Sequence, residues 1–221
     1  MQTNLNFTKF DMRNAGNVRA KSAQYKTKMT IAPTFEKIYD STALTRHELA
    51  QIAAAHQSVT FTKGEYLLQR GQVAKSYFCI EQGLVRSYVY DYEGQDITTG
   101  FVGDAEIAID VVSLFQQVPA MENMHAITDI VAWKIDYPVF QQLFLEIPAF
   151  SEWGRTWMAQ SLFRCKQRSV SMITDTATQR YLTLQQRHPR LLLQAPLKHV
   201  ASYLGITDTS LSRIRKEVAK H

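Results

Sequence analysis

The uneven placement of glycine along the chain is the feature that most constrains its fold. Between Ser58 and Asp136, short apolar runs alternate with glycines, namely Gly64, Gly71, Gly83, Gly94, Gly100 and Gly103. Short apolar runs separated by glycine turns are typical of antiparallel strands, which can close into a β-roll or jelly-roll barrel. After Asp136 the glycines nearly vanish and the apolar residues take up helical spacing. The sequence therefore predicts an α+β protein with an N-terminal β-roll or jelly-roll and a helical C-terminal part.

Two local patterns refine the N-terminal half. The segments Leu84–Tyr92 and Asp96–Val102 flank a Glu-Gly turn and predict a hairpin, one face of which carries Tyr88, Tyr90 and Tyr92. The sequence leaves open whether that face lines the interior of the roll. Further towards the N-terminus, Thr45 and Glu48 have the spacing of a capping box, which predicts a short helix that ends near His56.

Three helices are predicted after Asp136, over Pro138–Glu146, Ala149–Thr174 and Thr176–Arg187. In the long middle helix, residues at alternating four- and three-residue spacing form a stripe like the seam of a two-helix coiled coil, made of Met158, Leu162, Cys165, Ser169 and Met172. We interpret this stripe as the dimer seam of a homodimer. The alternative is that the stripe packs on the β-roll of its own chain.

The segment from Leu197 to Ala219 contains two amphipathic stretches separated by a short turn. Its predicted scaffold consists of Ala201, Leu204, Gly205, Ile206, Leu211 and Ile214. Ala201 is small enough for two crossing helices to approach, and Gly205 can adopt the positive φ that a tight turn needs. The pattern predicts a helix-turn-helix with Thr207 as the cap of its second helix. The alternative is a helix pair that serves packing alone.

The polar side chains of the second helix are candidate DNA contacts, because a recognition helix reads base edges from the major groove. They are Asp208, Thr209, Ser210, Ser212, Arg213, Arg215 and Lys216. Arg213 is the first choice for a guanine, since a guanidinium can donate two hydrogen bonds to one base. The residues assigned to phosphates are Ser210, Ser212, Arg215 and Lys216. Asp208 also favours the positive N-terminal end of the helix dipole.

The distribution of charge agrees with a polyanionic partner. The net charge of the 221-residue chain is +5, and residues 1–30 hold six Lys and Arg against Asp11 alone. Residues 196–221 hold five against Asp208 and Glu217. Neutralisation of phosphates with release of counterions drives nucleic-acid binding, so these basic ends suit DNA. We interpret residues 1–30 as a basic, flexible tail.

Several classes of protein are disfavoured by what the sequence lacks. Cys79 and Cys165 are the only cysteines and the histidines are scattered singly, so we expect neither a disulfide nor a metal site. No glycine-rich phosphate loop and no serine elbow motif is present, so we expect no enzyme. The apolar runs are shorter than the roughly 20 residues of a membrane span, and the polar N-terminus lacks a signal-peptide core. We therefore expect a cytoplasmic protein without membrane contact.

These motifs resemble the Crp/Fnr superfamily, especially its compact Bacteroidetes forms. The resemblance is carried by the glycine order, Gly103-Asp104, and the segments Tyr137–Phe140, His199–Thr207 and Leu211–Arg215. It implies a cyclic-nucleotide-binding-like sensor domain over residues 31–148, a dimerisation helix over 149–174 and a helix-turn-helix domain over 175–221. It also implies a transcription regulator that binds a palindromic site on double-stranded DNA as a homodimer, with RNA polymerase as a candidate partner.

The ligand-binding side departs from the family. The nucleotide-binding branch carries a Gly-Glu-Leu and an Arg-Ser, where this chain has Ile107-Ala108-Ile109 and Ala120-Met121. Without the glutamate and the arginine, the charge-assisted contacts to a ribose and a cyclic phosphate are lost. We expect no cyclic nucleotide as a cofactor and leave the identity of any other effector open. The N-terminal cysteine cluster of the oxygen-sensing branch is missing as well.

The DNA-binding side also departs from the family. Its base-contacting positions fall on Asp208, Thr209 and Arg213, of which Arg213 alone keeps the residue type of the cyclic-AMP receptor branch. The sequence ends at His221, so we expect the phosphate contacts of a β-hairpin wing to come from elsewhere. An alternative function follows from these departures, namely a ligand-sensing or protein-interaction module of the same fold that has lost DNA binding.

Overall fold

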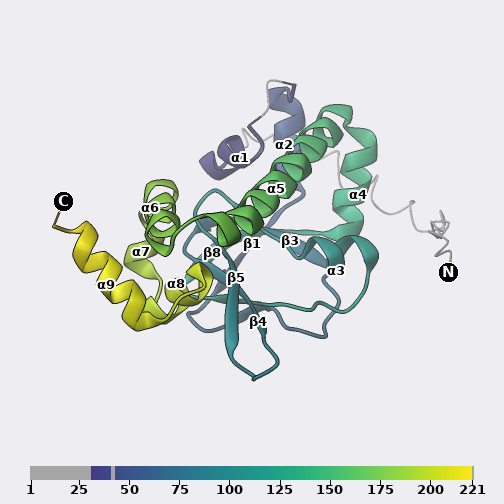
Figure 1. Ribbon diagram of the computed structural model, residues 1–221. Coiled ribbons are helices and arrows are strands. Elements are labelled where there is room, and N and C mark those ends of the chain that lie inside the picture. The colour runs from purple at the N-terminus through teal and green to yellow at the C-terminus, as the bar shows by residue number, and fades with distance from the viewer. Residues whose placement is uncertain (1–30, 41–42, 221) are drawn as a thin grey trace, which may run out of the picture. The chain divides into compact units, whose positions relative to one another are not determined.

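The computed structural model of the chain describes residues 31–40 and 43–220 (Figure 1). The predicted basic tail, residues 1–30, lies outside the described residues. Two short helices come first, α1 (Pro33–Ile38) and α2 (Arg46–Ala54). The predicted capping box at the start of α2 is confirmed, because the Thr45 side chain accepts from the Glu48 N–H and the Glu48 carboxylate accepts from the Thr45 N–H.

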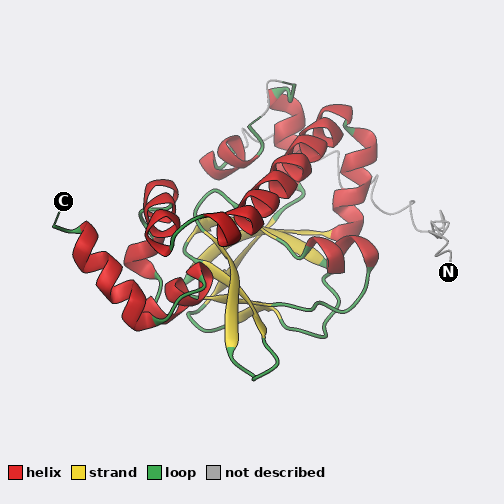
Figure 2. Cartoon of the chain, viewed as in Figure 1, coloured by secondary structure: helices red, strands yellow, loops and turns green. Residues whose placement is uncertain are grey.

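The glycine-rich part of the chain forms two four-stranded antiparallel sheets, as predicted for a β-roll (Figure 2). One sheet has the strand order β1-β8-β3-β6, and the other has the order β2-β7-β4-β5. The strands are β1 (Gln57–Phe61), β2 (Tyr66–Leu68), β3 (Ser76–Gln82), β4 (Val85–Tyr90), β5 (Asp96–Val102), β6 (Ile107–Ala108), β7 (Asn123–Ala126) and β8 (Ile130–Asp136). The short helix α3 (Val111–Gln116), which the sequence did not predict, joins β6 to β7.

The predicted hairpin is formed by β4 and β5, and β5 lies at the edge of its sheet. Gly94 takes a φ of +81° in the turn, where glycine carries no steric penalty. The side chain of Val85 belongs to the core of the roll. Successive side chains of a strand point to opposite faces, so Arg86 and Tyr88 share the face of β4 that is opposite Val85. The tyrosine-bearing face is therefore the outer face of the roll, which answers the question that the sequence left open.

The main hydrophobic core contains residues from both sheets and from the helices beside them. Ile80 and Ala132 come from one sheet, Val85 and Met124 come from the other, and Phe150 comes from the long helix α5 (Pro148–Thr174). The predicted helix before it is α4 (Tyr137–Glu146). These contacts hold α5 alongside the roll (Figure 1).

The helical part continues with α6 (Ala177–Arg187), α7 (Leu191–Gln194), α8 (Leu197–Leu204) and α9 (Asp208–Val218). A second core joins Val200, Leu204 and Leu211 of this part to Leu84 and Ile127, which belong to the β-roll region. The two regions therefore share buried apolar surface across the boundary that the sequence predicts at residue 175. Within the described part of the chain, no helix combines the length and apolarity needed to cross a membrane.

Candidate nucleic-acid interface

Helices α8 and α9 and the turn between them have the geometry of a helix-turn-helix. Gly205 ends α8 with a φ of +67°, which is the positive φ that the sequence predicted. The Ile206 N–H donates to the Ala201 carbonyl at 3.0 Å and the Gly205 N–H donates to the Ser202 carbonyl at 3.1 Å, a pair of bonds that satisfies the end of the helix. Thr207 caps α9, because its side-chain oxygen accepts from the Ser210 N–H at 3.2 Å.

The inner faces of the two helices are apolar and buried against each other. Of the predicted scaffold, Ala201, Leu204, Leu211 and Ile214 are at most 5% exposed, and so is Val200 beside them. Ile206, in the turn, is partly buried against the same core. Because the scaffold uses one face of α9, the opposite face is left for solvent or for a partner.

The outer face of α9 carries most of the side chains that the sequence assigns to DNA. The exposed ones are Asp208, Thr209, Arg213, Arg215 and Lys216. Ser210 and Ser212 are partly buried, and the Ser210 hydroxyl oxygen accepts a hydrogen bond from the Thr207 hydroxyl at 3.0 Å. The structure thus places the predicted base-reading residues at the surface, whereas Ser210 is engaged in the cap of its own helix.

The cations of this face are available to an external anion. Among the residues that the structure describes, no carboxylate forms an ion pair with Arg213, Arg215 or Lys216. His199, on α8, adds no positive charge at neutral pH, because burial and the nearby guanidinium of Arg86 lower its pKa to about 4. The positive potential of the face therefore comes from its arginines and lysine.

Helix α5 exposes apolar side chains along the predicted dimer seam. Leu162 is 72% exposed and Cys165 is exposed, but Met158 and Met172 are each only 37% exposed. Met158 lines a cavity of its own chain, and Met172 lies against Gly205 in the helix-turn-helix. The Ser169 hydroxyl donates to the Cys165 carbonyl within α5. The centre of the seam thus faces outward, while its two ends also contact their own chain.

Three further apolar side chains of α5 are exposed beside this seam, namely Phe163, Val170 and Ile173. They were not predicted as seam residues, because they lie outside the four- and three-residue spacing of the stripe. An exposed apolar surface of this kind is typical of a contact with another protein.

The places that correspond to the nucleotide contacts of the family are closed and apolar. Ala108 is 0% exposed and Ala120 is 4% exposed, and both belong to the main core. The nearby carboxyl of Glu122 has a raised pKa, mainly because it is buried and also because Asp110 lies close to it. Arg168 also lies near this carboxyl and lowers its pKa, but by less.

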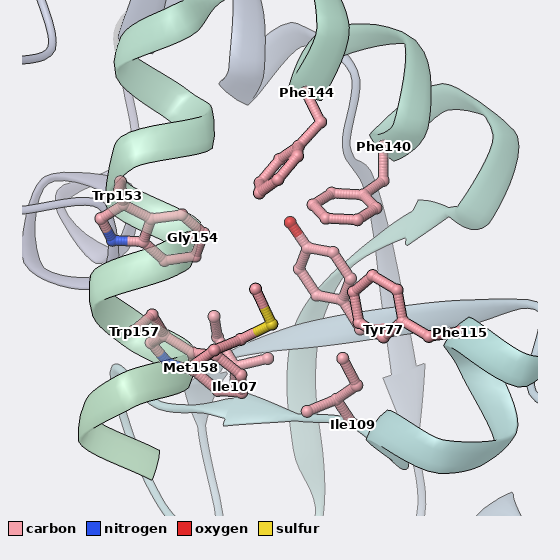
Figure 3. Close-up of a pocket in the computed structure, with 10 residues that line it drawn as sticks. All are labelled: Tyr77, Ile107, Ile109, Phe115, Phe140, Phe144, Trp153, Gly154, Trp157 and Met158. Carbon is pink, nitrogen blue, oxygen red and sulfur yellow. The ribbon is translucent and has the colours of Figure 1, made fainter. Parts of the chain in front are cut away.

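An apolar cavity lies between α5, α4 and the β6–α3 segment (Figure 3). Its volume is about 30 Å³, and aromatic and aliphatic side chains form most of its lining. Figure 3 shows the side chains of Phe144, Ile109 and Met158 turned towards this space. The Phe144 ring packs directly on α5 at Gly154, where a Cβ atom would overlap it. A space of this size is too small for a nucleotide, and its apolar lining offers an ordered water few hydrogen-bond partners.

A buried ion pair that the sequence did not predict lies on the outer face of the roll. The Arg86 side chain is 1% exposed, and its Nη1 and Nη2 donate to the Asp96 carboxylate at 3.1 and 3.0 Å. Its Nε donates to the Thr98 hydroxyl at 2.8 Å. Since every side of this guanidinium is engaged, Arg86 holds the β4–β5 hairpin together and is not free to bind an anion. The alternation along β4 was the signal that could have placed Arg86 on the face of Tyr88.

Comparison with known proteins agrees with this architecture. Residues 58–146 match the family model of the cyclic nucleotide-binding domain. The structure of FixK2 from Bradyrhizobium japonicum is 16% identical over 75% of this chain and 85% of that chain, with a TM-score of 0.67. The c-di-GMP responsive global regulator CLP from Xanthomonas campestris is 14% identical over 80% of this chain and 92% of that chain, with a TM-score of 0.61.

The catabolite activator protein of Thermus thermophilus is 16% identical over 85% of this chain and 87% of that chain, with a TM-score of 0.54. No curated protein sequence matches the chain significantly. All three structures are Crp/Fnr-family regulators, and at these identities the likeness is one of fold. The chain therefore has a Crp/Fnr-type cyclic nucleotide-binding fold, as the sequence predicted.

Proposed function

We propose that this protein is a sequence-specific transcription regulator that binds double-stranded DNA as a homodimer and has no enzymatic activity. The observation that carries the proposal is the outer face of α9, where Arg213, Arg215 and Lys216 are exposed and free of carboxylate partners within the described chain. A helix-turn-helix presents such a face to the major groove. The regulators of the same fold support this assignment.

The proposed roles follow from side-chain type and position. Arg213 lies on the outer face one turn into α9, and its guanidinium would read a guanine through two parallel hydrogen bonds. Asp208 and Thr209, in the first turn, would meet the neighbouring bases. Arg215 and Lys216 would hold phosphates, with Ser210 and Ser212 as further phosphate contacts.

The homodimer is supported by the exposed apolar residues of α5. Leu162 and Phe163, which are 72% and 68% exposed, have no cover within the described chain. A second copy of α5 would bury this surface and would place two α9 helices on two half-sites of a palindrome. We further propose that the protein acts in the cytoplasm, with RNA polymerase as a partner.

The sensor domain is proposed to act without a cyclic nucleotide. Ala108 and Ala120 offer no charge or hydrogen-bonding side chain, and Glu122 and Asp110 add negative charge close by. A cyclic phosphate and its ribose would therefore find neither the arginine nor the glutamate that the nucleotide-binding branch supplies at these places. Any effector of this domain would differ chemically from a cyclic nucleotide.

One observation favours a second candidate, a protein-interaction module of the same fold. The carboxylate of Asp208 is exposed in the first turn of α9, where it would approach the negatively charged groove. The two functions differ in their response to salt, because each phosphate contact releases counterions. A regulator loses DNA affinity steeply as salt rises, whereas an interaction module has no such affinity.

A fluorescence anisotropy titration of a labelled duplex with the full chain tests the proposal. We expect binding at low salt, and the logarithm of the binding constant should fall linearly with the logarithm of the salt concentration. Light scattering should give the mass of a dimer. The Arg215→Ala and Lys216→Ala double variant lacks two of the proposed phosphate contacts, so its binding constant should depend less steeply on salt concentration. Absence of binding at low salt by a folded dimer would contradict the proposed function and would favour the interaction module.

A further inference from the structure

The first helix of the helix-turn-helix is attached to the free edge of the β-roll. Strand β5 is the edge strand of its sheet, so some of its backbone groups lack a neighbouring strand. The Thr98 N–H at this edge donates to the Ser202 hydroxyl of α8 at 2.8 Å. A side chain of the DNA-reading unit thus completes the hydrogen bonding of the sensor sheet.

The next residue of α8, Tyr203, lies between the sensor sheet and the long helix. Its ring meets the ring of Phe101, on β5, with centroids 5.4 Å apart and planes inclined by 64°. On α5, the Arg168 guanidinium lies 4.4 Å from the centre of the same ring, and its Nη2 donates to the Tyr203 carbonyl at 3.0 Å. Tyr203 is therefore held by two separate elements, through an aromatic pair and a cation–π contact.

The turn that follows is fixed from the same side. Arg180, on α6, donates from Nε and Nη2 to the Leu204 carbonyl at 3.1 and 3.0 Å, and from Nη1 to the Asp175 carbonyl at 2.6 Å. Met172, near the end of α5, packs against Gly205 so closely that a Cβ atom there would lie 2.5 Å from its Cε. The turn that leads into α9 is thereby tied to the end of α5.

We propose that Tyr203 is a positioning residue that fixes the angle between α5 and the reading helix α9, and that it thereby sets the half-site spacing the dimer accepts. The inference rests on the proposed function, because it takes α5 as the dimer helix and α9 as the reading helix. Among the contacts described above, Tyr203 alone links β5, α5 and α8, so its loss weakens the attachment of the reading unit to two elements at once.

Half-site spacing is a sensitive measure of this angle. One additional base pair moves the second half-site by about 3.4 Å along the duplex and rotates it by about 34°. A rigid joint between α5 and α9 can match one spacing and must strain to match its neighbours. A loosened joint accepts several spacings at similar affinity, because no single orientation is favoured before binding.

The first experiment compares the full chain and its variants on palindromic operators whose spacer is shortened by one base pair, unchanged or lengthened by one. For the parent we expect the preferred spacing to bind at least ~10-fold more tightly than either neighbour. In Tyr203→Leu, which loses the ring, this ratio should fall towards one, while Tyr203→Phe, which keeps the ring, should retain it. Tyr92→Leu is the matched control, because Tyr92 is 96% exposed at the hairpin tip.

A second variant approaches the same contact from α5. Arg168→Met keeps an apolar side chain over the ring but removes its charge and the hydrogen bond to Tyr203, and it should also flatten the spacing preference. If both Tyr203→Leu and Arg168→Met keep the parental ratio while remaining folded, the inference is wrong and the proposed function is untouched.

The second experiment needs no DNA and separates the two proposals. Spin labels on Gln160→Cys, which is exposed on α5 outside the seam, and on Glu217→Cys in α9 report the distance between the helices. Cys165→Ser removes the other exposed thiol, and Cys79 is buried. We expect a narrow distribution for the parent and a broad one for Tyr203→Leu, in samples diluted with unlabelled chain. Equally narrow distributions would overturn the inference, and a parent that binds no DNA but shows the narrow-to-broad change would overturn the proposed function alone.

Discussion

Asp96→Asn should destabilise the protein strongly, because it leaves a buried cation without its partner. The Arg86 side chain is 1% exposed and donates both of its ionic hydrogen bonds to the Asp96 carboxylate. The asparagine side chain is the same size, but it carries no charge and turns an NH2 group towards a guanidinium that can only donate. Breaking a buried ion pair in this way costs about 3–5 kcal/mol. Since Asp96 itself is 39% exposed, water can reach part of the guanidinium, and we expect about 2–3 kcal/mol.

The measurement is the free energy of unfolding in urea, followed by tryptophan fluorescence and circular dichroism. Asp96→Asn should cost less than about 1 kcal/mol in an Arg86→Met background, where no buried charge remains to be neutralised. The matched surface control is Asp136→Asn, which breaks the pair between Lys134 and Asp136, whose side chains are 33% and 45% exposed. We expect that change to cost below ~1 kcal/mol.

The pH dependence gives an independent check on the same pair. The hydrogen bonds from Arg86 hold the pKa of Asp96 below its usual value in the folded protein. The folded state therefore binds the proton less well than the unfolded state, and the pair stabilises the fold above the unfolded pKa and loses this contribution as pH falls through the folded pKa. Asp96→Asn should remove this part of the acid sensitivity. An equal cost of Asp96→Asn in both Arg86 backgrounds would refute the reasoning.

Three further predictions follow from the candidate site. Arg213→Ala should weaken specific DNA binding by about 1–3 kcal/mol without changing the unfolding free energy, whereas Arg164→Ala, on the exposed side of α5, should change binding little; equal affinities of Arg213→Ala and the parent would contradict the assignment. Leu162→Glu should yield a folded monomer with weak DNA binding, since Leu162 is 72% exposed and does not belong to the core of its own chain. An unchanged dimer mass in light scattering would refute the seam. Cyclic AMP should leave the thermal unfolding midpoint unchanged, because Ala108 and Ala120 cannot replace the charged clamp; a ligand at a hundred times its Kd would add about 2.7 kcal/mol and raise the midpoint clearly.

The elements that the sequence predicted best are those with a local physical signal. The capping box at Thr45, the turn glycines at Gly94 and Gly205, and the helical spacing after Asp136 each depend on residues a few positions apart. The same holds for the inner face of α9, where Leu211 and Ile214 are buried as the spacing predicted. Local sequence therefore predicted the β-roll, the long helix and the helix-turn-helix, but not the short helices α1, α3 and α7, which are too brief to show a period.

The contacts between elements could not be predicted in this way. Ser202 completes the edge of β5 across 104 residues, and Arg168 reaches Tyr203 across 35. A periodic pattern shows which face of a helix is apolar but not which surface covers it. For this reason the ends of the predicted seam at Met158 and Met172 were assigned to a partner, although both also pack against their own chain.

Selection of the purified full chain against a random duplex library tests the central claim most directly. The account predicts enrichment of a two-fold symmetric sequence with half-sites about one helical turn apart. With Arg213→Ala, the base preference at the positions that Arg213 reads should be lost. An enriched site without symmetry would contradict the dimer of α5 helices. No enrichment by a folded, dimeric protein at low salt would contradict the assignment of α9 as a DNA-reading helix.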